Sequence, residues 1–334
     1  MKKVGVVGAG SWGTTLANVL AKKGYAVTLW AYEKDLVARM NKTHINDFYL
    51  DGFTLSPNLT FTNDLAEAVV GSEMLVLVSP SQVMRIVLKQ LKPYLSEECL
   101  LVSAAKGIEN ETLLTMSEVL LEVLGASVKN RCAFLSGPSF AREVAGEQPT
   151  AVAVAAEDLD VAHKVQAFFS TDYFRVYTNQ DVVGVEIGGA MKNVIALAAG
   201  VGDGLGYNYN ARTALITRGL VEISRLGAAK GAREETFFGL SGMGDLVLTC
   251  TGDLSRNRSV GVELGRGRKL DEILNKMHMV AEGVKTTLSA YQLAAKLGVT
   301  MPITEQMYKV LYEDKEPKKA VADLMTRALS SEDE

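Results

Sequence analysis

Two kinds of run are missing from this 334-residue sequence: a long cluster of basic residues, and an uninterrupted apolar stretch long enough to span a bilayer. The formal net charge is −4, which argues against a large nucleic-acid footprint. A small anionic substrate is still compatible with this balance, because it needs only two or three local cations. We therefore expect neither nucleic-acid binding nor membrane insertion.

Cysteine is also scarce. The chain has only three, Cys99, Cys132 and Cys250, and no C-x-x-C pair. This odd and widely spaced set is typical of a protein of the reducing cytoplasm and not of a disulfide framework. The expected location is therefore cytoplasmic.

Histidine, the usual acid–base residue of enzymes, occurs only at His44, His163 and His278. None of the three stands in a spacing typical of a metal site or of a catalytic motif. We expect all three to be structural, and we expect no bound metal. If the chain is an enzyme, another side chain must move its protons.

The first half of the sequence alternates short β-branched runs with helical patterns. Strands are predicted at Lys3–Val7, Ala26–Trp30, Met74–Ser79, Leu100–Ala104, Phe134–Ser136 and Ala151–Ala155. This alternation predicts a doubly wound parallel sheet of Rossmann type with right-handed crossovers. From about Gly184 onward helical patterns dominate, as in Ala211–Leu226, and no strand is predicted. The predicted fold class is α/β plus all-α, with a dinucleotide-binding domain at residues 1–184 and an all-helical substrate domain at 185–330.

A glycine-rich loop connects the first predicted strand to the first predicted helix, Thr14–Lys23. It places Gly8, Gly10 and Gly13 in the spacing G-x-G-x-x-G. Gly8 permits a tight turn, Gly10 lets the backbone approach a pyrophosphate, and Gly13 lets helix and strand pack closely. The helix N-terminus supplies amide donors to the anion. In this context the motif predicts a dinucleotide site, whereas alone it would be a weak indication.

The end of the second predicted strand does not decide between NAD and NADP. In the simplest Rossmann pattern an acidic residue here binds the adenosine ribose hydroxyls, but this chain has Ala31 near that place. Glu33 can perform the task slightly displaced, Tyr32 can stack on adenine, and Lys34 can meet a 2′-phosphate. A solvated loop of mixed charge is an equal alternative for Glu33 and Lys34.

Lys192 lies in a small and apolar predicted helix, GGAMKNVIALAAG, at residues 188–200. A cation there is costly unless it faces a polar cleft or has a partner. Desolvation and a second ammonium nearby would lower its pKa and make a neutral amine available to take a hydroxyl proton. The alternative, equal on this segment alone, is a lysine whose stem covers apolar surface and whose tip reaches water.

Two further segments follow predicted strands, at the carboxyl edge of the sheet where ligands bind in α/β folds. Lys106 follows the strand that ends near Ala104, and an exposed loop lysine is its alternative interpretation. The segment SGPSFA at residues 136–141 can present backbone amides to a ligand. Its Gly137 and Pro138 are equally typical of a plain turn.

The stretch SGMGDLVLTCTGDLSRNR at residues 241–258 combines a buried-looking aspartate with a polar loop. Asp245 stands between glycines and an apolar run, so it needs a cationic or hydrogen-bonding partner, such as a lysine of the site. The final SRNR offers a hydroxyl, an amide and two guanidinium groups, and arginine suits bidentate phosphate recognition. Taken alone, such a polar loop is more often solvated surface.

Together these segments resemble the bacterial NAD(P)-dependent glycerol-3-phosphate dehydrogenases. The matching stretches cover essentially the whole chain: Gly8–Gly13, Lys106-Gly107, Ser136–Ala141, Val185–Gly200, Ala211–Gly219, Leu240–Asn257 and Met301–Glu305. The resemblance implies a reversible hydride transfer between C2 of sn-glycerol 3-phosphate and the nicotinamide of NAD or NADP, giving dihydroxyacetone phosphate. It also implies a role in phospholipid synthesis.

The resemblance further implies roles for single residues, with Lys192 as the proton acceptor for the C2 hydroxyl. The implied substrate-binding residues are Lys106, Gly137, Ser139, Lys192, Asp245, Ser255, Arg256 and Asn257. The implied cofactor-binding residues are Gly8, Gly10, Ser11, Trp12, Gly13, Tyr32, Lys106, Ala141, Arg256, Val280 and Glu282. Two positions depart from the family pattern. Ser139 replaces a frequent threonine and keeps the hydroxyl, and Tyr32 replaces a frequent basic residue, which weakens an inference of strong NADP preference.

Two other functions stay open at this point. A β-hydroxyacid or phosphogluconate type of dehydrogenase can also combine a Rossmann domain, a helical domain and a helix lysine, but a carboxylate substrate does not require the loop at residues 255–258. A protein that binds NAD(P) without turnover fits the fold as well, although Lys106, Lys192 and Asp245 disfavour it. The expected partner is a small phosphorylated molecule, and apolar helices in the second domain favour a homodimer.

Overall fold

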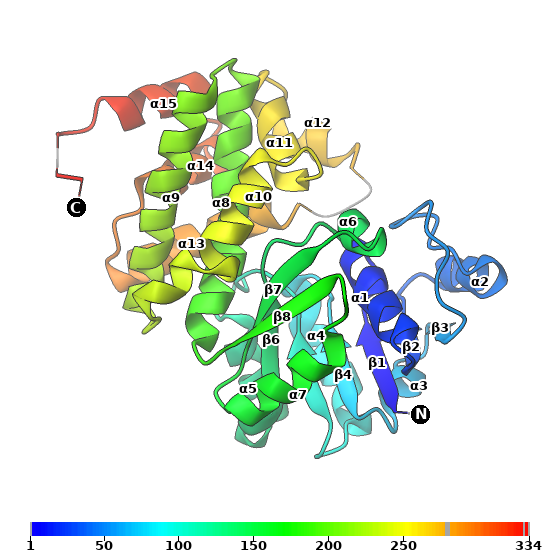
Figure 1. Cartoon of the computed structure of the whole chain (residues 1–334). Coiled ribbons are helices and arrows are strands. Elements are labelled where there is room, and N and C mark those ends of the chain that lie inside the picture. Colours follow the sequence, from blue (N-terminus) through cyan, green and yellow to red (C-terminus); the bar gives the residue numbers. More distant parts are fainter. Residues whose placement is uncertain (1, 278–280, 330, 333–334) are drawn as a thin grey trace.

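The computed structural model describes residues 2–277, 281–329 and 331–332. An α/β body formed by the first half of the chain packs against a group of helices formed by the second half (Figure 1). The eight strands form one sheet in the order β3-β2-β1-β4-β5-β6-β7-β8. Their bounds are β1 (Lys3–Val7), β2 (Ala26–Trp30), β3 (Leu59–Thr62), β4 (Met74–Leu77), β5 (Leu100–Ser103), β6 (Cys132–Ser136), β7 (Thr150–Ala155) and β8 (Phe174–Asn179).

The strand order confirms the doubly wound Rossmann-type sheet. From β1 the chain proceeds outward to β2 and β3 on one side, then returns to β4, β5 and β6 on the other. The order therefore reverses between β1 and β4, and in such sheets ligands bind beyond the carboxyl ends of the strands at this reversal.

The prediction of a wholly parallel sheet is wrong at one edge, because β7 runs antiparallel to β6. The connection from β6 to β7 contains only the five-residue helix α6 (Ala141–Ala145), which packs on α1. At about 1.5 Å per residue this helix is too short to run back along the sheet as a crossover helix does. The sequence analysis also missed β3 and β8. In β8 the buried Phe174 and Val176 alternate with the exposed Arg175 and Tyr177, so no short β-branched run of the kind used for the other strands marks it.

The remaining helices of the first half are α1 (Ser11–Lys22), α2 (Lys34–Thr43), α3 (Leu65–Val69), α4 (Met84–Leu91), α5 (Met116–Leu124) and α7 (Leu159–Phe169). Beyond β8 the described residues form helices and no strand, as predicted. These are α8 (Val182–Gly204), α9 (Tyr209–Ala229), α10 (Asp245–Thr251), α11 (Arg256–Gly265), α12 (Leu270–Leu274), α13 (Glu282–Leu297), α14 (Pro302–Tyr312) and α15 (Pro317–Met325). Because α8 begins at Val182, a boundary between residues 184 and 185 falls within its first turn, and the exact division stays a prediction.

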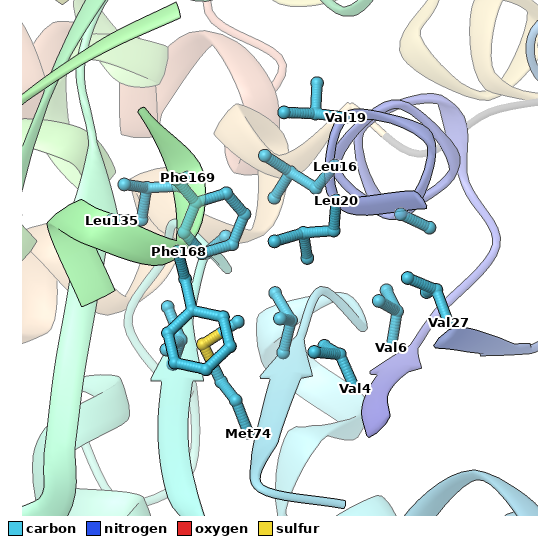
Figure 2. Close-up of a cluster of buried hydrophobic side chains, with 14 of the residues drawn as sticks. Val4, Val6, Leu16, Val19, Leu20, Val27, Met74, Leu135, Phe168 and Phe169 are labelled. Atoms are coloured by element: carbon cyan, nitrogen blue, oxygen red, sulfur yellow. The ribbon is translucent and has the colours of Figure 1, made fainter. Parts of the chain in front are cut away.

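The core under the glycine loop holds that loop in place. Val4 and Val6 of β1 face Leu16 and Leu20 of α1, and Phe169 of α7 packs against the same cluster (Figure 2). All five side chains are fully buried. Full burial of one such side chain contributes about 1.5–3 kcal/mol, so α1 is fixed firmly on the sheet. The start of α1 therefore has a fixed position at the carboxyl end of β1.

The long helix α8 is the centre of the helical part. It is long and apolar enough to cross a membrane by length and composition, but 89% of its most apolar window is buried inside the protein. It packs against α9, α10, α11 and α13, and its first half also contacts the sheet at β6. These contacts identify α8 as a core helix of the folded chain, which carries its side chains to the edge of the sheet.

Candidate active site

Polar side chains from both halves of the chain meet at the carboxyl edge of the sheet. The loops after β1, β4, β5 and β6 all leave the sheet at this edge, because these strands run parallel. Helix α8 and the segment at residues 240–249 pack against the edge from the helical side. The sequence-predicted residues can therefore be placed relative to one another.

Lys106, Lys192 and Asp245 form one buried charge cluster. The Asp245 carboxylate is 1% exposed and accepts hydrogen bonds from Lys192 Nζ on Oδ1 and from Lys106 Nζ on Oδ2, each at 2.5 Å. Lys106 Nζ also donates to the Gly137 carbonyl oxygen at 3.2 Å. The three residues come from the loop after β5, from α8 and from the first position of α10. The prediction that Asp245 needs a cationic partner is confirmed, and it has two.

Burial and the neighbouring charges shift the pKa values of two residues of the cluster. Burial lowers the pKa of Lys192 to about 8; Asp245 opposes this shift, and the nearby ammonium of Lys106 adds to it. Burial alone would raise the pKa of Asp245, but the two lysines outweigh it and hold that pKa below its ordinary value. Asp245 is therefore a permanent carboxylate, and Lys192 can exchange a proton near neutral pH.

Each ammonium in the cluster has one N–H donor that no described residue accepts. Lys192 Nζ uses two of its three donors, on Asp245 and on Thr249 Oγ1 at 3.0 Å, among the residues that the structure describes. Lys106 likewise uses two, on Asp245 and Gly137. One N–H of each lysine is thus available to a substrate oxygen at this edge of the sheet.

Thr249 and Asn193 are polar residues of the site that the sequence analysis missed. Thr249 Oγ1 donates to the Asp245 carbonyl oxygen at 2.6 Å and accepts from Lys192. It stands four positions after Asp245 on α10, and this spacing on a helix could have identified it. Asn193 follows Lys192 on α8 and accepts a hydrogen bond from the Asn257 side chain at 2.8 Å.

The prediction of a polar loop at residues 255–258 is wrong, because Ser255 is the N-cap of α11 and the next three residues form its first turn. The four residues of this SRNR segment are used differently. Ser255 caps α11 by accepting the Arg258 N–H, and the Asn257 amide bridges Asn193 of α8 to the Gly283 N–H of α13. Arg258 binds Asp203 and Asp253, each at 2.8 Å. Arg256 has neither a hydrogen-bond nor an ion-pair partner among the described residues. The two guanidinium groups are therefore not equivalent, and only Arg256 is available to a ligand.

Arg256 and Glu282 lie near each other at the N-termini of α11 and α13. Crowding by surrounding protein lowers the pKa of the Arg256 guanidinium, although the side chain reaches solvent, and Glu282 opposes this shift. Burial raises the pKa of the Glu282 carboxyl, against the effect of its Ser81 hydrogen bonds and of Arg256. Ser81 Oγ donates to Glu282 Oε2 at 2.8 Å, which joins the loop after β4 to α13. Val280, the other residue predicted here, lies outside the described residues.

The glycine loop has the geometry that the motif requires. Gly8 has a φ of +117°, and a Cβ on Gly13 would lie 1.8 Å from the Gly8 carbonyl oxygen. Around Gly10, by contrast, an added Cβ would meet nothing within 4 Å. Gly10 directly precedes α1, so the loop presents an uncovered helix N-terminus. These features fit a bound pyrophosphate.

The other residues predicted to contact the cofactor have different surroundings. Ser11 Oγ donates to the Tyr49 carbonyl oxygen at 2.6 Å, and Ala141 accepts a hydrogen bond from Thr15 of α1 at 3.1 Å, so both lie beside the glycine loop. Trp12 is partly buried against the core, whereas Tyr32 is 81% exposed after β2. Ser139 donates to the Gly137 carbonyl oxygen at 3.0 Å, close to Lys106.

Comparisons with known proteins agree with this arrangement. A family model described as NAD-dependent glycerol-3-phosphate dehydrogenase N-terminus matches residues 3–162, and its C-terminus counterpart matches residues 181–322. The glycerol-3-phosphate dehydrogenase [NAD(P)+] of Syntrophotalea carbinolica is 66% identical over 98% of this chain and 99% of its own length. That of Geobacter metallireducens is 64% identical over 98% of this chain and 97% of its own length. The crystal structure of glycerol-3-phosphate dehydrogenase from Coxiella burnetii superposes with a TM-score of 0.92 at 39% identity, covering 98% of this chain and 99% of that one.

Proposed function

Because the chain belongs to the NAD-dependent glycerol-3-phosphate dehydrogenase family, we propose that Lys192 is the group that gives and takes the proton in its reaction. The protein is an oxidoreductase that acts on the CH–OH group of glycerol 3-phosphate and uses NAD or NADP. It is therefore an enzyme and not a passive nucleotide-binding protein. The observation that supports the role of Lys192 is its buried ammonium, which shares the Asp245 carboxylate with Lys106.

Lys192 acts on the oxygen at C2. When dihydroxyacetone phosphate is reduced, its C2 carbonyl carbon gains a hydride and its oxygen gains a proton from Lys192 Nζ. In the oxidative direction the neutral Lys192 amine takes the C2 hydroxyl proton. A pKa of about 8 makes both protonation states accessible near neutral pH. Bound NAD(P)H supplies the hydride, and NAD(P)⁺ takes it back.

Lys106 and Asp245 adjust the charge around that oxygen. Two ammonium groups face one carboxylate, so the cluster carries a net positive charge when both lysines are protonated. That charge stabilises the alkoxide that develops at C2, in a site where burial strengthens the interaction. Asp245 holds both lysines in position before the substrate arrives. Gly137 and Ser139, which lie beside Lys106, belong to the same substrate site.

Arg256 and the N-terminus of α11 bind the phosphate of the substrate. The guanidinium has no partner within the part of the chain that the structure describes, and the Ser255 and Asn257 side chains hold the start of α11 in place. A helix N-terminus and an arginine fork both favour a phosphate monoester. Phosphate binding away from C2 then orients the reacting carbon towards Lys192.

The glycine loop and its surroundings hold the dinucleotide. Gly8, Gly10 and Gly13 form the pyrophosphate cradle. Further contacts come from residues of both halves of the chain: Ser11, Trp12, Tyr32, Lys106, Ala141, Arg256, Val280 and Glu282. In this assignment residues 1–184 form the dinucleotide-binding domain and residues 185–330 the substrate domain.

The wider setting follows from the same family. We expect the enzyme to work in the cytoplasm, without membrane insertion, and to supply glycerol 3-phosphate for phospholipid synthesis. A homodimer is supported by the exposed apolar side chains of Phe238, Met243, Val247 and Leu254 in the helical part. Light scattering in solution tests this state directly.

Lys192→Met tests the proposed proton transfer. The variant removes the amine and keeps the apolar stem, and the Asp245 carboxylate retains Lys106 as its partner. We expect kcat for dihydroxyacetone phosphate reduction to fall by about 10²–10⁴-fold, the usual contribution of a general acid. The measurement is the loss of nicotinamide absorbance under saturating cofactor.

Lys230→Met is the matched control. Lys230 is also a largely buried lysine paired with a carboxylate, Glu118 at 2.5 Å, but it lies at the end of α9 away from the cluster. The kcat of Lys230→Met for dihydroxyacetone phosphate reduction should stay close to that of the parent protein. Near-normal turnover of Lys192→Met would reject the proposed acid.

A further inference from the structure

The segment after β2 contains a carboxylate that its own helix does not use. Ala31 is fully buried and donates its N–H to Thr62 at the end of β3, so its methyl group occupies the place where simple Rossmann folds carry an acidic residue. Glu33, two positions on, is the N-cap residue of α2. Its side chain makes no capping hydrogen bond to that helix.

The Glu33 carboxylate is instead held by Tyr49. Tyr49 Oη donates to Glu33 Oε1 at 2.8 Å. Burial, together with Glu33, raises the pKa of the Tyr49 phenol to about 12, so the hydroxyl remains a donor throughout the physiological range. The position of this carboxylate therefore depends on where Tyr49 is fixed.

Tyr49 is fixed to the glycine loop. Its carbonyl oxygen accepts from Ser11 Oγ at 2.6 Å, and its N–H donates to Asn46 Oδ1 at 3.0 Å. The fully buried Asn46 in turn donates to the Ala9 carbonyl oxygen at 2.8 Å. These bonds connect Glu33 through Tyr49 to the two residues that flank Gly10. A dinucleotide seated on the glycine loop thus meets a carboxylate at the end of β2, in the region of its adenosine ribose.

Two arginines contact the segment at residues 39–53, and both are bound to groups other than Glu33. Arg39 on α2 is paired with Asp47 at 2.9 Å, and Arg142 donates to the Asp51 carbonyl oxygen at 2.9 Å. Glu33 and Lys34 take part in no ion pair within the described ranges of the chain. A 2′-phosphate, which carries up to two negative charges, would approach a carboxylate that Tyr49 holds in place and a lysine, Lys34, that no described residue holds.

We propose that Glu33, positioned by Tyr49, makes this enzyme select NAD over NADP. The carboxylate accepts hydrogen bonds from the ribose hydroxyls of NAD and repels the 2′-phosphate of NADP. This inference rests on the proposed function for its dinucleotide site, and it decides a choice that the names of the relatives leave open.

The test is calorimetric titration of the full-length protein with NADH and NADPH, repeated with 5′-AMP and adenosine 2′,5′-bisphosphate. The last two ligands have no nicotinamide, so they report on the adenosine end alone. We expect the parent protein to bind NADH roughly tenfold or more tightly than NADPH, the order expected for one like-charge contact near a protein surface. Glu33→Gln should weaken NADH binding and strengthen NADPH binding. Tyr49→Phe should reduce the ratio of the NADPH to the NADH dissociation constant by a smaller amount.

Asp35→Asn is the control, because it removes one negative charge from the same helix end without touching Tyr49. Its ratio of the two dissociation constants should match the parent ratio. Equal or tighter binding of NADPH by the parent protein, an unchanged ratio in Glu33→Gln, or no binding of either dinucleotide would overturn the inference. Turnover of dihydroxyacetone phosphate is measured separately. A protein that binds NADH selectively but turns over no substrate would contradict the proposed function and leave the selection by Glu33 intact.

Discussion

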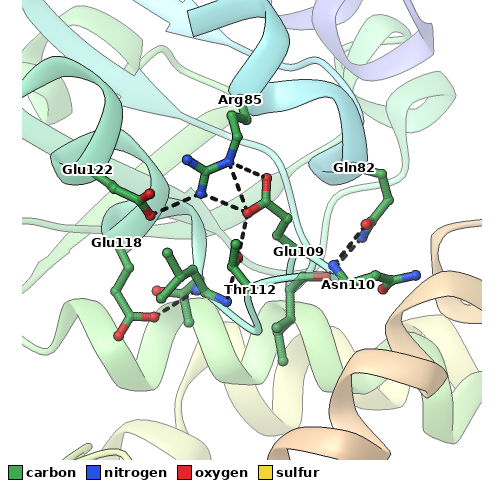
Figure 3. A network of polar contacts seen from close by, with 10 residues as sticks. Gln82, Arg85, Glu109, Asn110, Thr112, Glu118 and Glu122 are labelled. Atoms are coloured by element: carbon green, nitrogen blue, oxygen red, sulfur yellow. Dashed lines mark hydrogen bonds and ion pairs between the residues drawn. The ribbon is translucent and has the colours of Figure 1, made fainter.

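Two charge clusters of this protein lie on either side of one short segment, and they are built in opposite ways. The first, at Lys106, Lys192 and Asp245, has two cations on one carboxylate. The second has one cation, Arg85 of α4, on two carboxylates, Glu109 and Glu122 (Figure 3). Lys106 and Glu109 are only three positions apart in the chain.

In the second cluster, which we call closed, both oxygens of the Glu109 carboxylate are bound by neighbouring side chains. Arg85 binds Glu109 through Nε at 2.9 Å and Nη2 at 2.8 Å, and Nη2 also reaches Glu122 at 3.0 Å. Thr112 Oγ1 donates at 2.5 Å to Glu109 Oε2, the oxygen that Arg85 Nη2 also binds. Burial would raise the pKa of Glu109, but Arg85 and Thr112 outweigh it and lower that pKa. These bonds tie the segment at residues 106–112 to α4 and α5.

The first cluster is open, because its two ammonium groups share one buried carboxylate and each keeps an N–H without a partner among the described residues. The excess carboxylate of the second cluster, Glu122, is 54% exposed and therefore solvated. The excess ammonium of the first cluster is largely buried and can act on a substrate. The difference between the clusters therefore separates a structural role from a catalytic one. Four predictions test this difference between the clusters.

Asp245→Asn should have the largest effect, because it affects both stability and catalysis. The variant leaves two buried ammonium groups without a counter-ion, which costs about 3–5 kcal/mol of unfolding free energy. It also releases both lysines, so kcat should fall by at least about 100-fold. Urea unfolding and steady-state kinetics measure the two effects. A stable variant with normal kcat would show that the carboxylate does not organise the site.

Arg256→Gln should have the next largest effect, on substrate binding. Losing hydrogen bonds to a phosphate costs about 1.5–3 kcal/mol, so kcat/KM for dihydroxyacetone phosphate should fall by roughly ten- to a hundredfold. At saturating cofactor, turnover of unphosphorylated dihydroxyacetone should hardly change. Arg258→Gln is the control, because Arg258 is engaged with Asp203 and Asp253. If Arg258→Gln caused the greater loss of kcat/KM, the assignment of the phosphate site would be reversed.

The rates of dihydroxyacetone phosphate reduction and of glycerol 3-phosphate oxidation should depend on pH in opposite ways. On the sloping limb of each pH profile the rate should change about tenfold per pH unit. Reduction needs the protonated Lys192, so its rate should fall as pH rises through about 8. Oxidation needs the neutral amine, so its rate should rise through the same range and then level off. In Asp245→Asn both limbs should move to lower pH, because the carboxylate that favours the charged amine is gone. Limbs that do not move would mean that another group titrates.

Part of this comparison was accessible from the sequence. Lys106, Lys192 and Asp245 were each predicted from local context: the end of a strand, an apolar helix and a glycine-flanked aspartate. Their common contact was not, because Lys106 and Asp245 are 139 positions apart and only the fold brings them together.

The differences between neighbouring residues were also inaccessible. Arg256 and Arg258 look alike in the sequence, but residues two apart on a helix face different directions, and only Arg258 meets Asp203. In the same way Glu33 and Lys34 look equivalent in the sequence, and only the contact with Tyr49, on the other side of α2, distinguishes Glu33. Local patterns identified the chemical groups, and long-range packing decided how each is used.

Glu109→Gln should have the smallest effect on catalysis, and it isolates the closed cluster. Glu109 is 7% exposed, but Arg85 keeps Glu122 as a partner, so the loss of stability should be about 1–2 kcal/mol. The midpoint of urea unfolding should fall, while kcat stays within a fewfold of the parent value. The pH profile should keep its limbs near pH 8, because Lys106 and Asp245 remain paired. If Glu109→Gln shifted the limbs of the pH profile as Asp245→Asn does, the two clusters would be electrostatically coupled. The segment at residues 106–112 would then influence the pKa of Lys192 in addition to its structural role.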